Sequence, residues 1–211
     1  MKEAPRFSPV FLQPSDRLVT VFGGGKVAYR KCCNFEGFRI KAVAAEVVPE
    51  IRQMAAEVVL CPIDEKVVRR ELAGTFIAVA STSDKALNEM VCRVAKDMGV
   101  PVNSAHGGGD VLIPSVLRKR NYTVAVSSEG KVPAFPPYVV EQLDTLLGES
   151  YDSMMDLLIR IRPEVMEKIG TQPARAEFLA DIVRDKEIWH MLEDGDLDGA
   201  VEYALSKGGL L

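Results

Sequence analysis

The chain has 211 residues, of which 47% are hydrophobic and 27% charged, and its formal net charge is −4. This length predicts one domain with an appendage or two small domains, and the hydrophobic share excludes intrinsic disorder. A slightly acidic chain has no global attraction for nucleic acid or an anionic membrane, so an anionic ligand requires a local basic patch. No stretch approaches the ~20 apolar residues of a membrane span, and residues 1–16 lack the apolar core of a signal peptide.

The four cysteines, Cys32, Cys33, Cys61 and Cys92, form no C-x-x-C pair and have mainly apolar neighbours. This usage is typical of a reduced compartment. We therefore expect a cytoplasmic protein whose partners include neither nucleic acid nor membrane.

The first half of the chain alternates short apolar strands with helical segments. Residues 18–22 are apolar and β-branched and end at three glycines, and helical spacing then runs from Val27 to Phe35 before Gly37. Further strands are predicted at 39–44, 58–60, 76–80 and 100–103, and further helices at 51–57, 67–72 and 85–98. Because strands that alternate with helices pair in parallel, the sequence predicts an α/β fold with a doubly wound parallel sheet.

The rhythm changes after the glycines at 107–109. Two strand-like runs around a charged turn predict a β-hairpin, prolines then interrupt the chain, and only helical patterns follow. The predicted segments are strands 111–117 and 122–127, a helix from about Tyr138 to Leu147 after Pro133, Pro136 and Pro137, and helices from Asp152 onward. We expect a first domain over 1–112, a hairpin and helix segment over 113–150 and a helical domain over 151–211.

A glycine-rich turn, Gly23-x-Gly25-x-x-Ala28, joins the first strand to the first helix. The first glycine permits the turn, the second lets backbone N–H groups approach a pyrophosphate, and the small third residue lets helix and strand pack closely. Glu46 follows the second strand 21 positions after Gly25, where a carboxylate accepts hydrogen bonds from ribose hydroxyls and favours NAD over NADP. The pattern predicts a Rossmann-type NAD-binding domain. The alternative is a plain tight turn with a solvated Glu46.

Polar residues follow strand 76–80 at its carboxyl end, where ligands gather in open α/β sheets. Thr82 and Asp84 are therefore placed towards the cofactor, although Ser83 or Asp84 could instead cap the next helix. For Asn88 and Asn103 the same two interpretations are open, a contact with the cofactor or a purely structural role.

Five motifs in a fixed order, between about residues 7 and 147, are more specific than the glycine turn alone. They are Val21-Phe22-Gly23-Gly24-Gly25-Lys26-Val27-Ala28-x-Arg30-Lys31, Ala80-x-Thr82-x-Asp84-x-x-x-Asn88, Val102-Asn103, Ile113-Pro114-Ser115 and Val124-Ala125-Val126-Ser127-Ser128-x-Gly130-x-x-Pro133. In this combination the chain resembles the precorrin-2 dehydrogenase family, which is also the amino-terminal module of siroheme synthases. The helical tail is similar in kind to that family's third domain.

The resemblance implies NAD-dependent oxidation of precorrin-2 to sirohydrochlorin by a homodimer, with 113–150 as the dimerisation segment. It also implies that Lys26, Val27, Ala45 and Glu46 contact NAD. Thr82, Asp84 and Asn103 would line the nicotinamide end. Together with the glycine turn, the predicted cofactor contacts are Gly23, Gly24, Gly25, Lys26, Val27, Ala28, Ala45, Glu46, Thr82, Ser83, Asp84 and Asn103.

One position departs from the family. Members that also insert iron have an aspartate three residues after the asparagine that matches Asn103, and this chain has His106 there. A histidine can accept a proton during dehydrogenation, or from a pyrrole nitrogen before metal enters. Asp110 in the same glycine-rich loop is the second candidate proton acceptor. The alternative for His106 is a loop residue without a task, and two histidines without a cysteine set predict no protein-bound metal.

The substrate that the resemblance implies is a tetrapyrrole with many carboxylates, which need positive or hydrogen-bonding groups. The predicted substrate contacts are Ser115, Arg118, Arg120, Ser127 and Ser128, with Lys119 completing the basic cluster. A solvated hairpin tip and strand-end caps are the alternatives.

Three functions remain open at this point. The first is a precorrin-2 dehydrogenase, the second a bifunctional dehydrogenase and sirohydrochlorin ferrochelatase, and the third a non-catalytic NAD-sensing regulatory module.

Overall fold

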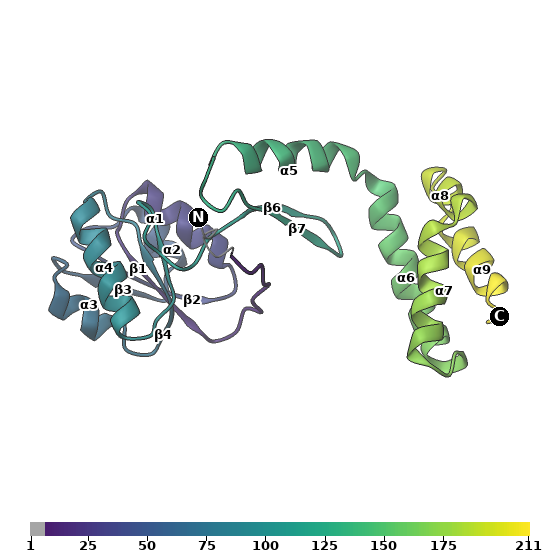
Figure 1. Ribbon diagram of the computed structural model, residues 1–211, viewed down its shortest axis with the longest axis horizontal. Helices are drawn as coiled ribbons and strands as arrows, with labels where there is room; N and C mark the ends of the chain where they lie inside the picture. The colour runs from purple at the N-terminus through teal and green to yellow at the C-terminus, as the bar shows by residue number, and fades with distance from the viewer. Residues whose placement is uncertain (1–6) are drawn as a thin grey trace, which may run out of the picture. The chain divides into compact units, whose positions relative to one another are not determined.

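The computed structural model describes residues 7–211, which form two compact units (Figure 1). The first unit consists of the described residues up to Ile113 together with Glu129–Lys131. The second consists of Pro114–Ser128 and Val132–Leu211.

The first unit is built on a parallel sheet, as predicted. Its strands, in the order β3-β2-β1-β4-β5, are β1 (Leu18–Phe22), β2 (Arg39–Ala44), β3 (Glu57–Leu60), β4 (Thr75–Ala80) and β5 (Val102–Ser104). Val21 in the central strand pairs with Ala42 of β2 on one side and with Val79 of β4 on the other. The chain reverses direction across the sheet between β1 and β4, and ligands bind outside the carboxyl ends of strands at such a point.

Helices cover both faces of this sheet (Figure 1). They are α1 (Lys26–Cys32), the short 3-10 helix η1 (Cys33–Phe35), α2 (Pro49–Met54), α3 (Glu65–Glu71) and α4 (Lys85–Asp97). Val19, Val21 and Ile51 are fully buried in one core, and Phe22 and Val91 in the other. Burial of each such side chain contributes about 1.5–3 kcal/mol, so the two cores hold the carboxyl ends of the strands in a fixed arrangement.

Among the helix starts that differ from the sequence-based expectation, two are explained by proline. The helix predicted over 51–57 spans Pro49–Met54, and the helix predicted from Tyr138 is α5 (Phe135–Leu146), which contains Pro136 and Pro137. Proline is tolerated in the first turn of a helix, where its missing N–H has no intrahelical acceptor and its fixed φ suits the helix. These prolines therefore lie inside the helices instead of preceding them.

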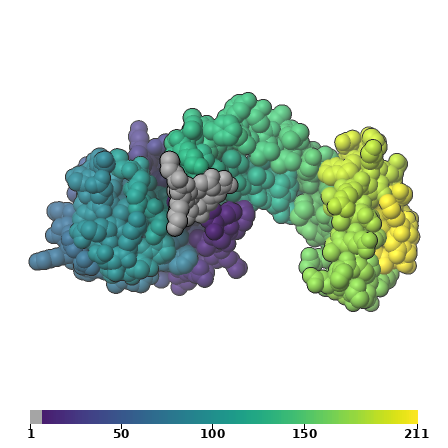
Figure 2. All heavy atoms as spheres, in the orientation of Figure 1, coloured from purple at the N-terminus to yellow at the C-terminus, as the bar shows by residue number. Residues whose placement is uncertain are grey.

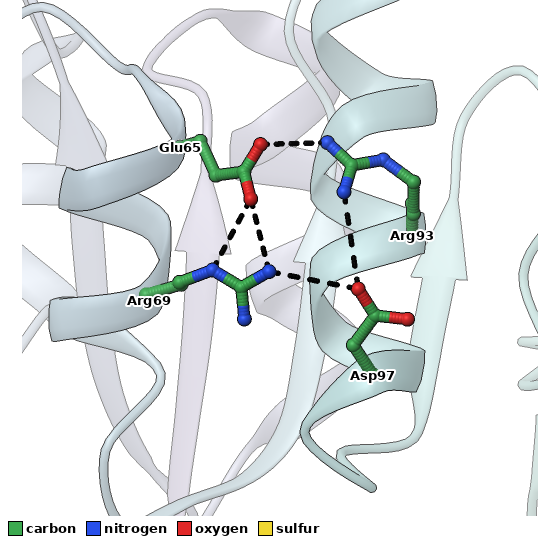
Figure 3. Close-up of polar contacts among 4 residues, drawn as sticks. All are labelled: Glu65, Arg69, Arg93 and Asp97. Carbon is green, nitrogen blue, oxygen red and sulfur yellow. Dashed lines mark hydrogen bonds and ion pairs between the residues drawn. The ribbon is translucent and has the colours of Figure 1, made fainter.

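Four charged residues connect α3 and α4 on their outer sides (Figure 3). Glu65 accepts hydrogen bonds from Arg93 at 2.7 Å and Arg69 at 2.9 Å, and Asp97 lies 3.6 Å from Arg69 and 3.8 Å from Arg93. The hydrogen bonds from Arg93 and Arg69 hold the pKa of Glu65 below its ordinary value. Because all four side chains are about half exposed, water screens the network and its contribution to stability is small.

The second unit joins an antiparallel hairpin to helices. The hairpin strands β6 (Ser115–Arg118) and β7 (Thr123–Val126) are shorter than predicted, and α5 contacts both. The helices α6 (Glu149–Lys168), α7 (Gln172–Arg184), α8 (Lys186–Glu193) and α9 (Leu197–Lys207) follow, and α7 to α9 form the green-to-yellow body in Figure 2. Their core includes the fully buried Leu157, Ile161, Ile182 and Ile188. Within residues 7–211, no helix is long and apolar enough to span a membrane.

Candidate functional site

A cavity of about 690 Å³ lies at the carboxyl ends of β1, β2 and β4. This volume falls within the range of small-molecule sites, about 300–1,000 Å³. Nine of the predicted cofactor contacts line it, namely Gly23, Gly24, Gly25, Lys26, Val27, Ala45, Glu46, Thr82 and Ser83. The remaining lining includes the apolar side chains of Val47, Val48, Ile63 and Leu87. The cavity therefore combines open backbone, one carboxylate and an apolar wall that suits an aromatic ring.

Gly23 forms the turn after β1. Its φ of +130° lies in the region that side chains disfavour, and a Cβ there would meet the Ser81 carbonyl oxygen at 2.6 Å. Its N–H donates to the Val43 carbonyl at 3.0 Å. Gly23 thus lets the chain turn while the ends of β2 and β4 stay close.

Gly24 supports the loop that carries Glu46. A Cβ on Gly24 would lie 1.8 Å from the Glu46 carbonyl oxygen, and the Val48 N–H donates to the Gly24 carbonyl at 2.8 Å. Gly24 is among the predicted cofactor contacts, but its packing role was not predicted. Three consecutive glycines were the only signal for it.

Gly25 is open to the cavity side. It is the N-cap of α1 with φ −91° and ψ −172°, a backbone conformation that any residue adopts. No atom of residues 7–211 lies within 4 Å of a Cβ built on it. The Tyr29 N–H donates to the Gly25 carbonyl at 3.0 Å, and the N–H groups before Tyr29 lie ahead of the first intrahelical bond. Ala28 is buried beneath the turn. Free backbone donors beside open space fit a pyrophosphate.

Thr82 begins a chain of hydrogen bonds that leads to His106. The Asn88 side chain is fully buried, and its Oδ1 accepts from the Thr82 N–H at 3.0 Å and from the Thr82 hydroxyl at 2.9 Å. The Asn88 Nδ2 donates to the Thr82 carbonyl at 3.0 Å and lies 2.7 Å from the His106 Nδ1. His106, which is exposed after β5, is thereby joined to a residue that lines the cavity.

Two predicted acidic site residues have structural contacts of their own. Asp84 caps α4, because its carboxylate accepts from the Ala86 and Leu87 N–H groups at 2.8 and 3.2 Å, and it does not line the cavity. Asp110 accepts from the N–H of Val102, the first residue of β5, at 2.6 Å. It therefore lies at the amino end of that strand, whereas the cavity lies at the carboxyl ends.

Asn103 is almost completely buried in β5. Its Nδ2 donates to the Val111 carbonyl at 2.8 Å, while its Oδ1 has no hydrogen-bond partner in the part of the chain that the structure describes. A buried amide oxygen without a donor is costly. Asn103 is not among the residues that line the cavity.

The basic hairpin turn is largely paired with acids of its own unit. Lys119 lies 2.7 Å from Asp144 of α5, and this hydrogen bond raises the pKa of Lys119. Arg120 lies 2.5 Å from Asp156 of α6. The predicted cluster of free cations is thus reduced to Arg118, which is exposed and forms no ion pair with a residue of the range 7–211.

The predicted serine contacts also belong to the second unit, whereas the cavity is lined by the first. Ser115 pairs with Val126 across the hairpin. The Ser128 hydroxyl closes a turn, donating to the Val132 carbonyl at 3.0 Å and accepting from its N–H at 3.2 Å. Ser127 immediately follows β7.

Residues 10–115 match the family model described as "Putative NAD(P)-binding". The chain belongs to this NAD(P)-binding family. Among curated relatives, the precorrin-2 dehydrogenase of Methanosarcina barkeri (strain Fusaro / DSM 804) is 26% identical over 198 residues, which cover 90% of this chain and 88% of that protein. The siroheme synthase of Neisseria meningitidis serogroup C (strain 053442) is 30% identical over 82% of this chain but only 37% of its own length. The chain therefore spans well under half of that synthase.

A solved structure, "SirC, precorrin-2 dehydrogenase", matches this NAD(P)-binding chain with a TM-score of 0.76 at 25% identity. The match covers 95% of this chain and all of that one. It confirms the predicted fold class, a Rossmann-type parallel sheet followed by a hairpin and a helical region, and the predicted resemblance to precorrin-2 dehydrogenases.

Proposed function

We propose that this chain is an NAD-dependent precorrin-2 dehydrogenase that oxidises precorrin-2 to sirohydrochlorin in siroheme synthesis. The observation that carries the proposal is the open space at Gly25, in the same cavity as the Glu46 carboxylate. Similarity to precorrin-2 dehydrogenases over nine tenths of the chain supports the choice of substrate.

The residues of the cavity have distinct roles in this proposal. Backbone N–H groups after Gly25 bind the pyrophosphate, and Glu46 accepts hydrogen bonds from ribose hydroxyls. Thr82 and Ser83 line the part of the cavity that we assign to the nicotinamide. NAD supplies a hydride acceptor, and precorrin-2 loses one hydride to it and one proton to solvent. The protein positions the two reactants and excludes water.

Glu46 selects NAD over NADP, because its negative charge repels the 2′-phosphate of NADP at the position where it accepts the ribose hydroxyl of NAD. We expect NAD to bind at least about tenfold more tightly than NADP, a difference of ~1.4 kcal/mol. Titration of both nucleotides measures this ratio. Equal affinities would remove Glu46 from the ribose site.

The proposal extends to the oligomeric state, the cellular compartment and the group that binds a substrate carboxylate. We assign a homodimer to the segment 113–150, in which the side chains of Val132, Phe135 and Tyr138 are each more than half exposed. The four cysteines are free thiols, which suits a reducing cytoplasm. Arg118 is the cation that we assign to a substrate carboxylate, because its neighbours Lys119 and Arg120 are paired with acids.

The proposal is tested by an anaerobic assay with precorrin-2 and NAD. The expected result is one NADH for each precorrin-2 consumed, with the absorption spectrum of sirohydrochlorin as product. Measurable NAD binding without NADH formation would favour the regulatory module instead. Addition of ferrous ion after the reaction tests the bifunctional alternative, which requires the sirohydrochlorin spectrum to change at an enzyme-dependent rate.

A further inference from the structure

The orientation of the Asn88 side-chain amide is fixed by the backbone of Thr82. The Thr82 N–H can only donate, so the amide atom 3.0 Å from it is the oxygen. The Thr82 carbonyl can only accept, so the atom 3.0 Å from it is the nitrogen. Exchange of the two atoms would set donor against donor and acceptor against acceptor in a fully buried position.

This orientation determines where His106 carries its proton. The Asn88 Nδ2 lies 2.7 Å from the His106 Nδ1 and still has one N–H to donate. His106 must therefore accept at Nδ1, and its neutral ring holds hydrogen on Nε2. The Nε2–H forms no hydrogen bond with any residue of the described range 7–211, so it is free to donate to a ligand.

We propose that Asn88 is a positioning residue that holds His106 as a hydrogen-bond donor, and that His106 donates from Nε2 to a carboxylate of the substrate. The substrate part rests on the proposed function, whereas the Asn88 part does not. This role replaces the proton acceptor that the sequence suggested for His106. A proton taken up at Nδ1 would face the Asn88 N–H, and Nε2 already carries one.

The surroundings of His106 agree with a fixed donor. Its own N–H donates to the Ser104 hydroxyl at 3.2 Å, and Lys96 of α4 donates to the Gly108 carbonyl at 2.6 Å two residues further on. The loop is thus attached to β5 and to α4 on either side of the ring. These contacts leave the orientation of the imidazole to Asn88.

The tautomer can be measured directly in the protein without ligands. The chain has only two histidines, His106 and His190, so long-range ¹H–¹⁵N correlation spectra at alkaline pH contain two imidazoles. His190 is exposed in α8, 3.7 Å from Glu193, and serves as the internal reference for a ring without a fixed amide partner. We expect hydrogen on Nε2 for His106. Hydrogen on Nδ1, or a mixture of the two forms, would overturn the proposal.

Asn88→Asp separates positioning from simple packing, because it keeps the shape of the side chain but presents an acceptor to His106. We expect the hydrogen to move to Nδ1, where it can donate to the carboxylate. Asn34→Asp, at an exposed asparagine whose Nδ2 donates to the Arg30 carbonyl, is the matched control and leaves the His106 signals unchanged. An unchanged Nε2–H form in folded Asn88→Asp contradicts the positioning role. If this variant does not fold, the wild-type spectrum alone decides.

The donor role is tested with His106→Gln and His106→Glu. Glutamine places an N–H near the Nε2 position but is no base, whereas glutamate only accepts. We expect His106→Gln to keep kcat/KM for precorrin-2 within about threefold, and His106→Glu to raise KM for precorrin-2 by about tenfold or more with KM for NAD unchanged. Loss of a general base costs about 10²-fold or more, so a His106→Gln variant that falls this far contradicts the donor role. Failure of the wild type to form NADH contradicts the proposed function and leaves the tautomer result standing.

Discussion

The glycine turn between β1 and α1 and the basic turn between β6 and β7 both contain residues that predict an anionic ligand. At the glycine turn the structure leaves the predicted groups open, because Gly25 faces space and lines a cavity. At the basic turn two of the predicted cations are already paired, because Lys119 and Arg120 form ion pairs with Asp144 and Asp156 of the same unit. Two sequence patterns that both predict an anionic ligand therefore differ in the structure: the groups of the glycine turn are open, and two of the three cations of the basic turn are paired.

The difference lies in what each signal depends on. A glycine turn acts through its own backbone, whose conformation is set by a few adjacent residues. A cluster of cations acts through side-chain charge, and any acid that folding brings near cancels it. Substitutions in the two turns therefore give different effects, and each tests one side of the comparison.

Gly24→Ala is expected to have the largest effect on stability. A Cβ 1.8 Å from the Glu46 carbonyl forces two backbone segments apart, which costs about 3 kcal/mol or more. We expect the melting temperature to fall by about 10 °C and NAD binding to weaken as Glu46 shifts. Gly148→Ala is the control, because a Cβ there meets no atom of the described residues within 4 Å. Equal melting temperatures for the two variants would show that the loops at Gly24 and Glu46 do not pack together.

Gly25→Val is expected to have the opposite profile. Its backbone accepts any residue, and an added Cβ meets no atom of residues 7–211 within 4 Å. The weaker N-cap preference of valine, about 1 kcal/mol, is therefore the main cost to the fold. The side chain instead fills the space that we assign to the pyrophosphate. We expect NAD affinity to fall about 100-fold, or ~2.7 kcal/mol, in a calorimetric titration. Unchanged affinity would exclude this turn as the pyrophosphate site.

Most of the fold could be predicted from the sequence because its signals are local. Runs such as 18–22 and 39–44 are apolar and end at glycine or polar residues, and the strands begin and end there. Two of the errors in helix starts fall where a proline has two interpretations. Pro49 and Pro136 lie in the first turns of helices, and composition does not distinguish a proline that starts a helix from one that precedes it.

The site could be predicted only where the chemistry is carried by neighbours in sequence. The contact of Gly24 with the Glu46 carbonyl, the hydrogen bond of Asn88 to His106 and the pairing of Arg120 with Asp156 join residues 18 to 36 positions apart. No spacing rule indicates such pairs, since they depend on how elements pack. Asp84 illustrates the same limit, because its sequence position suits both a helix cap and a ligand, and the structure shows the cap.

Arg120→Ala tests the occupied turn and has a moderate effect. The change removes the ion pair with Asp156, whose side chain is 23% exposed, while the backbone N–H at position 120 still donates to Asp152. We expect the melting temperature to fall by about 2–4 °C and KM for precorrin-2 to stay within about twofold. Arg118→Ala, at the exposed arginine without an ion pair, is the control for stability. A large rise in KM for Arg120→Ala without a change in melting temperature would mean that the turn binds substrate despite its pairing.

Arg93→Ala is expected to have the smallest effect on stability, and it is the reference against which the effect of Arg120→Ala is compared. Arg93 is 53% exposed and contacts Glu65 of α3 and Asp97 of its own helix, α4 (Figure 3). Alanine is the better helix former, which offsets part of the loss, and water screens the rest. We expect the melting temperature to fall by less than about 2 °C in low salt and not at all in 1 M salt, where the Debye length is about 3 Å. If Arg93→Ala destabilises as much as Arg120→Ala at both salt concentrations, the pairing at the basic turn is no tighter than an ordinary surface network, and its arginine is available to a carboxylate ligand.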